Sequence, residues 1–117
     1  MPDAAQMNRL ILNVERNGTR AIVHCRGRLV AGVGQGLYDR VQELLPEAKC
    51  IVLDLTEVAF VDSMGLGTLV RIYVSAKSAG SRVELVNLGK QIRELLGITN
   101  LLSVFTNICE SGVTMKF

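Results

Sequence analysis

The chain has 117 residues, a length that fits one domain with a single hydrophobic core. Charged residues make up 21% of it, and the net charge is +2, with Lys and Arg scattered along the sequence. This composition excludes an intrinsically disordered chain and gives no support for a nucleic-acid-binding surface. We therefore expect a globular protein with no direct nucleic-acid partner.

The cysteines are an odd set, Cys25, Cys50 and Cys109, without Cys-x-x-Cys spacing. With one histidine they make a poor zinc site, so we expect no metal and no cofactor. Reduced thiols indicate a reducing compartment. The segment Met1–Gln6 lacks the charged and apolar regions of a signal peptide, and no apolar run approaches the roughly 20 residues of a membrane helix. We therefore expect a cytoplasmic protein with no membrane partner.

The first part of the chain predicts a flexible arm followed by a hairpin. Residues 1–8 are expected to form the arm, and residues 9–117 the domain. Alternating apolar residues from Leu10 to Val14 predict a strand, and Asn17-Gly18 is a strong signal for a tight turn. Arg20–Arg26 is the expected returning strand.

The returning strand has two different faces. Its alternation places Ala21, Val23 and Cys25 on one face, which we expect to be buried. His24 falls on the other face. A catalytic or metal role for His24 would need partners that the sequence does not obviously supply, so we interpret it as a partly exposed strand residue.

A glycine-rich segment, Val30–Gly36, follows the hairpin. It lacks the Lys and Ser/Thr of a phosphate-binding loop, and its glycines do not have dinucleotide-binding spacing. We interpret it as a connection and the weak first turn of a helix. That helix buries Leu37, Val41 and Leu44-Leu45, and Pro46 ends it.

The run Cys50–Thr56 is apolar on both faces until Asp54. Such a pattern is typical of a central strand that is covered on both faces. Asp54 is expected near the carboxyl end of this strand. There it would lie within reach of the pair Asp62-Ser63.

The pair Asp62-Ser63 stands between this strand and the next helix. Ser63 falls at or just before the first helical turn, where backbone N–H groups have no partner within the helix. Asp62 or Ser63 can serve as the N-cap. A phosphate on Ser63 would accept free N–H groups and meet the positive end of the helix dipole. The alternative is that the pair only caps the helix.

The helix that follows is expected to end at Gly80 and to have one buried stripe. Gly65 and Gly67 fall off that stripe, and each costs about 1 kcal/mol of helix propensity relative to Ala. We expect them, with Met64, to form a flat surface beside Ser63 on which another protein docks. Tight internal packing is the alternative explanation for the glycines. The predicted stripe comprises Leu66, Leu69, Val70, Tyr73 and Ala76.

The rest of the chain predicts a short buried strand at Val83–Val86 and a short helix at Gly89–Leu96, with Gly97 as its C-cap. Leu101–Phe105 is expected to be a further extended apolar segment. Little is predicted for 106–117. The predicted core comprises Leu12, Val23, Leu37, Val41, Ile51, Leu53, Leu69, Tyr73, Leu85, Ile92 and Leu95.

Two neighbouring segments stand out in this order of strands and helices: Leu53-Asp54-Leu55 and, shortly after it, Phe60-Val61-Asp62-Ser63-Met64-Gly65-Leu66-Gly67. Together with that order, they closely resemble the STAS domain. Within that family the match is best to the anti-sigma factor antagonists. The resemblance covers about residues 10–105. It implies a single α/β domain with a mixed four- to five-stranded sheet, helices packed mainly on one side and the first strand antiparallel at an edge.

The resemblance also implies a regulatory switch. An anti-sigma factor serine kinase would phosphorylate Ser63, and a serine phosphatase would reset the protein. The unphosphorylated form would bind the kinase so that a sigma factor is released. The partner-binding residues implied or expected are Asp54, Asp62, Ser63, Met64, Gly65 and Gly67.

Two features depart from the family pattern. Gly27-Arg28-Leu29-Val30 stands where the family often has an acidic residue after the glycine, as in Gly-Glu-Leu-Asp. The family usually finishes with a longer amphipathic helix, but only a short tail with Gly112 follows Phe105. Either the last helix is short or the end of the chain has another role.

Two other function classes compete with the switch. A STAS module can serve as a scaffold or as a subunit of a transport complex, which would not need the Ser63 hydroxyl. An enzyme with Ser63 as nucleophile is disfavoured, because Val61 replaces the first glycine of the Gly-x-Ser-x-Gly elbow and His24 lacks an obvious orienting acid. We therefore expect no enzymatic activity.

Overall fold

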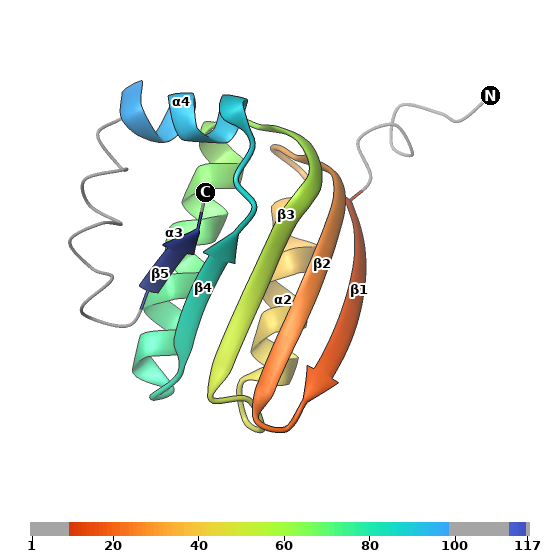
Figure 1. The fold of residues 1–117 in the computed structure, drawn as a ribbon, viewed down its shortest axis with the longest axis vertical. Coiled ribbons are helices and arrows are strands. Elements are labelled where there is room, and N and C mark those ends of the chain that lie inside the picture. Colours follow the sequence, from red (N-terminus) through yellow and green to blue (C-terminus); the bar gives the residue numbers. More distant parts are fainter. Residues whose placement is uncertain (1–9, 99–112, 117) are drawn as a thin grey trace.

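The computed structural model describes residues 10–98 and 113–116. These residues form a five-stranded sheet with the strand order β1-β2-β3-β4-β5, together with three helices (Figure 1). The elements are β1 Leu10–Asn17, β2 Arg20–Leu29, α2 Gly34–Leu44, β3 Cys50–Val61, α3 Ser63–Ser78, β4 Arg82–Val86, α4 Lys90–Ile98 and β5 Val113–Lys116.

The sheet is mixed, as expected. Strand β1 lies at one edge and pairs antiparallel with β2, whereas β2, β3, β4 and β5 pair in parallel. The predicted hairpin is confirmed, because Asn17 pairs with Arg20 across a tight turn. Gly18 in that turn has φ +63°, a conformation that glycine adopts without steric cost. The crossovers between the parallel strands place α2 and α3 on the sheet.

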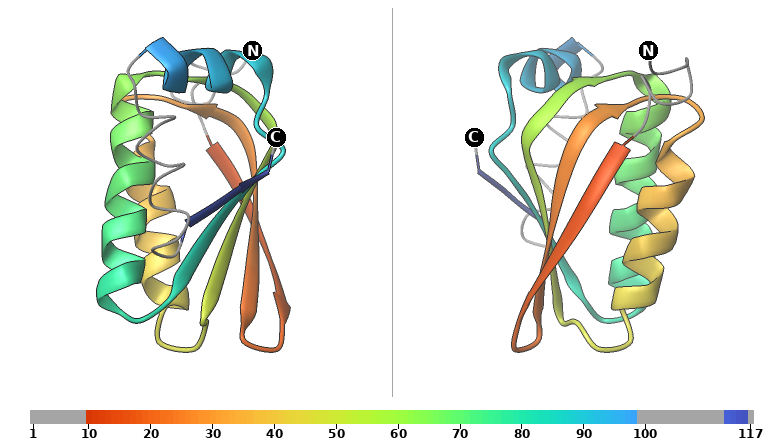
Figure 2. Two further views of the ribbon diagram at one scale, coloured as in Figure 1. Left: turned by 60° about the vertical axis from the view of Figure 1, so that its left-hand side comes forward. Right: turned by 90° about the vertical axis from the view of Figure 1, so that its right-hand side faces the viewer.

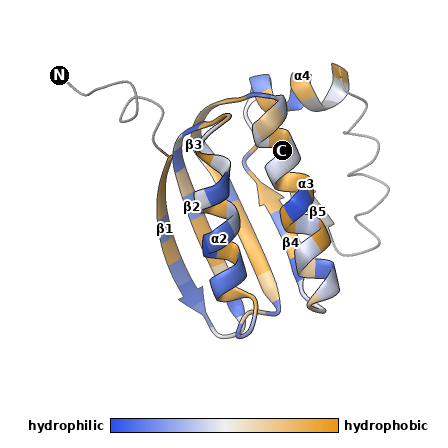
Figure 3. Ribbon diagram, turned by 180° about the vertical axis from the view of Figure 1, so that it is seen from behind, coloured by the Kyte–Doolittle hydropathy of each residue, from blue (hydrophilic) through white to orange (hydrophobic). Residues whose placement is uncertain are grey.

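Helices α2 and α3 lie side by side over one face of the sheet, and α4 lies across the end where β3 finishes (Figures 1 and 2). Seen from the helix side, the strands behind α2 and α3 are largely hydrophobic (Figure 3). The prediction of helices mainly on one side is confirmed. The prediction that β3 is covered on both faces is wrong for the described residues. Val52 is nevertheless buried on the other face, where its register partners are Ile22 and Glu84.

The hydrophobic core lies between the sheet and the two helices. Three predicted core residues, Leu12, Tyr73 and Leu95, are only partly buried and pack against its margin. The other predicted members are all buried. They are Val23, Leu37, Val41, Ile51, Leu53, Leu69, Leu85 and Ile92.

The inward face of α3 is displaced from the predicted stripe. It includes Gly65, Thr68 and Ile72, whereas the predicted members Val70 and Tyr73 are only partly buried. Thr68 meets α2 at Gly34, where a Cβ atom would collide with the Thr68 hydroxyl group. This close approach explains a buried polar residue in the helix interface. The Thr68 hydroxyl group donates a hydrogen bond to the Met64 carbonyl one turn earlier.

The last elements differ in part from the prediction. Helix α4 continues through Gly97 to Ile98, so Gly97 is not its C-cap. The end of the chain contributes β5, a strand rather than a helix. The predicted arm at 1–8, the segment Leu101–Phe105 and Cys109 lie outside the described residues.

Candidate functional site

Asp62 and Ser63 form a corner at the end of β3. Strand β3 runs through Val61, Asp62 takes an extended conformation as N-cap, and α3 begins at Ser63. The Asp62 Oδ1 atom accepts the backbone N–H of Gly65 at 2.8 Å, and Oδ2 accepts that of Ala31 at 3.1 Å. One carboxylate therefore caps α3 and also ties the loop before α2 to the corner.

The corner is also fixed to the end of β2. The backbone N–H of Asp62 donates to the Leu29 carbonyl oxygen at 3.2 Å. Gly65 lies against that same carbonyl: a Cβ atom on Gly65 would overlap its oxygen and lie 2.8 Å from its carbon. Gly65 is buried. The expectation that Gly65 lies on an exposed docking surface is therefore wrong, and tight internal packing explains it.

The other predicted residues of the corner are exposed. Ser63 and Gly67 face solvent, and the side chain of Met64 is 64% exposed. A Cβ atom on Gly67 would meet nothing within 4 Å. Within the described residues, the backbone N–H groups of Ser63 and Met64 have no acceptor, as expected for the first turn of a helix.

A shallow hollow adjoins the corner between the β2–α2 loop and α3. Met64, Thr68 and Arg71 line it from α3. The Arg71 guanidinium lies 4.2 Å from the ring centroid of Tyr38 on α2. The loop contribution to this surface was not predicted, since its residues carry no chemical motif. The loop residues that line the hollow are Val30, Ala31 and Gly32.

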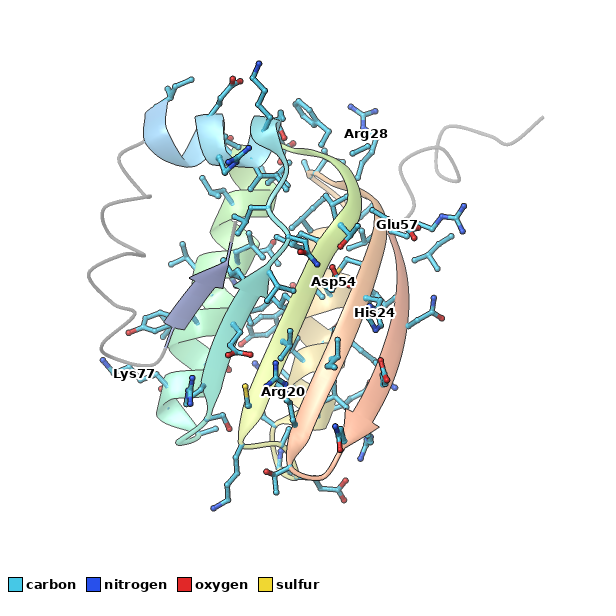
Figure 4. All side chains as sticks on the ribbon, in the orientation of Figure 1. Arg20, His24, Arg28, Asp54, Glu57 and Lys77 are labelled. Atoms are coloured by element: carbon cyan, nitrogen blue, oxygen red, sulfur yellow. The ribbon has the colours of Figure 1, made fainter. Side chains whose placement is uncertain are left out.

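Asp54 does not lie at this corner. The prediction placed it near the strand end, but β3 continues to Val61, and each strand residue advances the chain by about 3.3 Å. The Asp54 carboxylate accepts hydrogen bonds from Thr56 and from Asn87, and its Oδ2 atom lies 2.8 Å from His24 Nδ1. Figure 4 shows Asp54 and His24 side by side on the face of the sheet away from α2 and α3.

His24 has the acidic partners that the sequence did not reveal. Its Nδ1 atom faces Asp54 and its Nε2 atom lies 3.1 Å from Glu15 Oε2. The hydrogen bonds with Glu15 and then with Asp54 raise the pKa of His24. Partial burial opposes ionisation of Asp54, but hydrogen bonds from Thr56, Asn87 and His24 outweigh it and hold the Asp54 pKa at about 2. When it is protonated, His24 on β2 can donate to Glu15 on β1 and to Asp54 on β3 at the same time.

We expect this bridge to make stability depend on pH. Because folding raises the pKa of His24, its contribution is complete below the unfolded pKa of about 6.5 and is lost as pH rises through the higher folded value. Urea unfolding at several values between pH 6 and pH 8 should show stability falling with pH. The matched variant His24→Gln, which cannot be protonated, should lack this slope; an unchanged slope would contradict the assignment, since the chain has one histidine.

Because each carboxylate oxygen of Asp62 accepts its own hydrogen bond, we expect Asp62→Asn and Asp62→Ala to lower the stability of the protein by different amounts. Asp62→Asn retains one acceptor and should lose about 0.5–1 kcal/mol of stability, whereas Asp62→Ala loses both contacts and should lose about 2 kcal/mol. Chemical unfolding with Asp39→Asn as a surface control measures both. Equal losses for the two Asp62 variants would show that only one of these hydrogen bonds contributes.

Neither a metal site nor a serine-hydrolase arrangement is seen in the described residues. They contain no group of His, Cys, Asp and Glu side chains that could hold a metal ion. Both ring nitrogens of His24 face carboxylates on β1 and β3 rather than Ser63. No helix in the described ranges is long and apolar enough to cross a membrane.

The family model for the STAS domain matches residues 11–113. The chain belongs to the STAS domain family. A STAS-domain containing protein of Pseudomonas aeruginosa is 25% identical over 89 residues, which cover 76% of this chain and 88% of that protein.

Solved structures share the fold. The anti-sigma factor antagonist SpoIIAA in its unphosphorylated form matches with a TM-score of 0.66 and 14% identity, over 90% of this chain and 86% of that chain. The phosphorylated form of SpoIIAA from Bacillus matches with a TM-score of 0.65 and 13% identity, over 90% of both chains. The murine anion transporter Slc26a9 matches with a TM-score of 0.68 and 20% identity, over 88% of this chain but 17% of the transporter.

Proposed function

We propose that this STAS domain is an anti-sigma factor antagonist whose activity is switched by phosphorylation of Ser63. The unphosphorylated form binds an anti-sigma factor serine kinase in the cytoplasm, and a sigma factor is released. The kinase transfers the γ-phosphoryl group of ATP to Ser63 Oγ, with loss of the hydroxyl proton and release of ADP. A serine phosphatase hydrolyses the phosphate ester and restores binding.

The observation that carries this proposal is the position of Ser63. It is exposed at the first position of α3, directly after an N-cap that holds the corner by two side-chain hydrogen bonds. The free N–H groups at this helix start can donate hydrogen bonds to a phosphate on Ser63. The neighbouring surface offers the exposed residues Met64 and Gly67 to a partner. The fold shared with SpoIIAA, which is known in both phosphorylation states, supports the assignment.

The test is a capture experiment with Ser63→Ala as bait in a lysate of the source organism. We expect it to retain a small serine kinase, identified by mass spectrometry, and the matched bait Ser63→Glu to retain little or none. The recovered kinase should then phosphorylate the wild-type chain at Ser63 in the presence of ATP. Absence of any kinase from both baits would contradict the proposed function.

The shared fold with Slc26a9 favours one other function, a STAS module within a transport or signalling complex. Such a module would not need a reactive hydroxyl group at Ser63. Incubation with ATP and each candidate serine kinase from the same genome distinguishes the two. If Ser63 stays unmodified with every kinase, the module is the better assignment.

A further inference from the structure

Gln91 on α4 makes two hydrogen bonds to a single residue of β3. Its Oε1 atom accepts the backbone N–H of Val61 at 3.0 Å, and its Nε2 atom donates to the Val61 carbonyl oxygen at 3.0 Å. Val61 is the last residue of β3 and immediately precedes Asp62-Ser63. A planar carboxamide thus bonds to both main-chain polar groups of the residue that leads into the corner.

This arrangement replaces a missing strand neighbour. Strand β4 pairs with β3 only from Cys50 to Asp54, so the later part of β3 has no partner on that side from β4. On its other side Val61 pairs with Leu29 of β2. Because a primary carboxamide presents the same donor and acceptor as a peptide group, Gln91 completes the pairing of Val61. The end of β3 is therefore held from both sides.

We propose that Gln91 is a positioning residue for Ser63: it fixes the end of β3 so that the Ser63 hydroxyl group is presented in one orientation. Among the described residues, the other hydrogen bonds that join Asp62 to neighbouring elements lead to the opposite side, to Leu29 and Ala31. Phosphoryl transfer requires the attacking oxygen to be roughly in line with the leaving group. A small displacement of Ser63 therefore lowers the rate of transfer more than it lowers affinity. The kinetic part of this proposal rests on the proposed function.

The first test uses Gln91→Met, which preserves side-chain length and removes both hydrogen bonds. The matched control is Gln42→Met, since Gln42 also joins two elements, by donating to the Ser75 hydroxyl group far from the corner along α3. Hydrogen–deuterium exchange should accelerate by about tenfold or more at Val61, and at Gly65 and Leu66 at the start of α3, in the Gln91 variant only. Equal exchange in the two variants would overturn the proposal.

The second test uses Gln91→Glu, in which pH controls whether the side chain can donate a hydrogen bond to the Val61 carbonyl oxygen. The protonated carboxyl group both donates and accepts, as the carboxamide does, whereas the carboxylate only accepts and faces the Val61 carbonyl oxygen. The Val61 amide resonance should therefore match the wild-type position at low pH and move away from it as the carboxyl group ionises and the bond to the carbonyl oxygen is lost. Its midpoint should lie above the ordinary Glu pKa of about 4.3. A resonance that does not titrate would overturn the proposal even if Gln91→Met fails to fold.

The kinetic test uses the serine kinase captured by Ser63→Ala. Gln91→Met should lower kcat for Ser63 phosphorylation by about tenfold to a hundredfold, with KM changed less than about threefold, because orientation affects the transition state more than binding. Gln42→Met should leave both constants near wild type. A raised KM with an unchanged kcat would show that Gln91 acts on docking of the kinase, and would overturn the proposal. If no kinase modifies the wild-type chain, the proposed function fails, while the exchange and titration results still decide the role of Gln91.

Discussion

Under the proposed function, Ser63→Glu is expected to bind the anti-sigma factor serine kinase about a hundredfold more weakly than Ser63→Ala does. A phosphate on Ser63 brings about −1.5 to −2 charges into the interface, and glutamate brings one. The surface that receives this charge consists of Met64 and Gly67, and the Asp62 carboxylate lies next to it. Burial of an unpaired charge costs several kcal/mol, and a loss of about 3 kcal/mol corresponds to more than a hundredfold in affinity.

The same charge should not unfold the domain. Ser63 is exposed at the start of α3, where the N–H groups of the first turn and the helix dipole favour a negative group. We therefore expect a local change of the surface, not a refolded protein.

Calorimetric titration of the captured kinase with wild-type protein, Ser63→Ala and Ser63→Glu measures this effect. Far-UV circular dichroism and urea unfolding of the same variants are the controls and should agree closely. Equal affinity of the alanine and glutamate variants would contradict the electrostatic account. So would amide NMR shifts spread far beyond the corner after phosphorylation of Ser63.

The parts of this fold that sequence predicts correctly are those with local causes. Asn17-Gly18 marks the hairpin because the turn needs a positive φ, and Gly18 has one. Asp62 is predictable as a cap because a carboxylate at that position reaches the free N–H groups of the next turn. The exposure of Met64 and Gly67 follows from the helical stripe beside them. Each of these predictions needs only a few neighbouring residues.

The features that could not be predicted depend on strand register. Thr56 and Glu57 are polar, so the sequence indicates a strand end. Strand β3 nevertheless continues, and it stays paired with β2 as far as Val61 across two register shifts, in each of which β3 has an extra residue. The β2–β3 pairing sets His24 opposite Asp54, and the β1–β2 pairing brings Glu15 within reach of the same ring. Residues that far apart in the chain share no local pattern, so the histidine cluster and the position of Asp54 emerge only from the three-dimensional structure.

Gln91 escaped prediction for a related reason. A glutamine in the first turn of a short helix reads as an ordinary polar residue, and nothing local indicates that α4 lies across the end of β3. The need for another partner at Val61 becomes visible in the structure, because β4 already ends at Val86 and Gln91 bonds to Val61 instead. The candidate site is therefore assembled from the ends of β2 and β3, the β2–α2 loop, the start of α3 and helix α4.

Gly65→Ala is expected to destabilise the protein by about 2–3 kcal/mol or more, whereas Gly67→Ala should stabilise it by about 1 kcal/mol. The two glycines stand two positions apart in α3, so helix propensity favours both substitutions equally. They differ in surroundings: a methyl group on Gly65 would overlap the Leu29 carbonyl group, and one on Gly67 would meet open solvent. Overpacking of this kind costs roughly 1–3 kcal/mol or more, with the upper range expected where the obstacle is backbone.

Relief of that overlap must move α3 away from β2. The movement would break the hydrogen bond from the Asp62 N–H to the Leu29 carbonyl oxygen and displace the Asp62 carboxylate from Ala31. Urea unfolding measures the stability of both variants, and amide exchange at Gly65 and Leu66 reports whether the helix start has moved. Similar stabilities for the two variants would show that α3 accommodates a methyl group at Gly65. In that case the glycine is not needed for close packing, and its role would have to be sought at the partner surface beside Ser63.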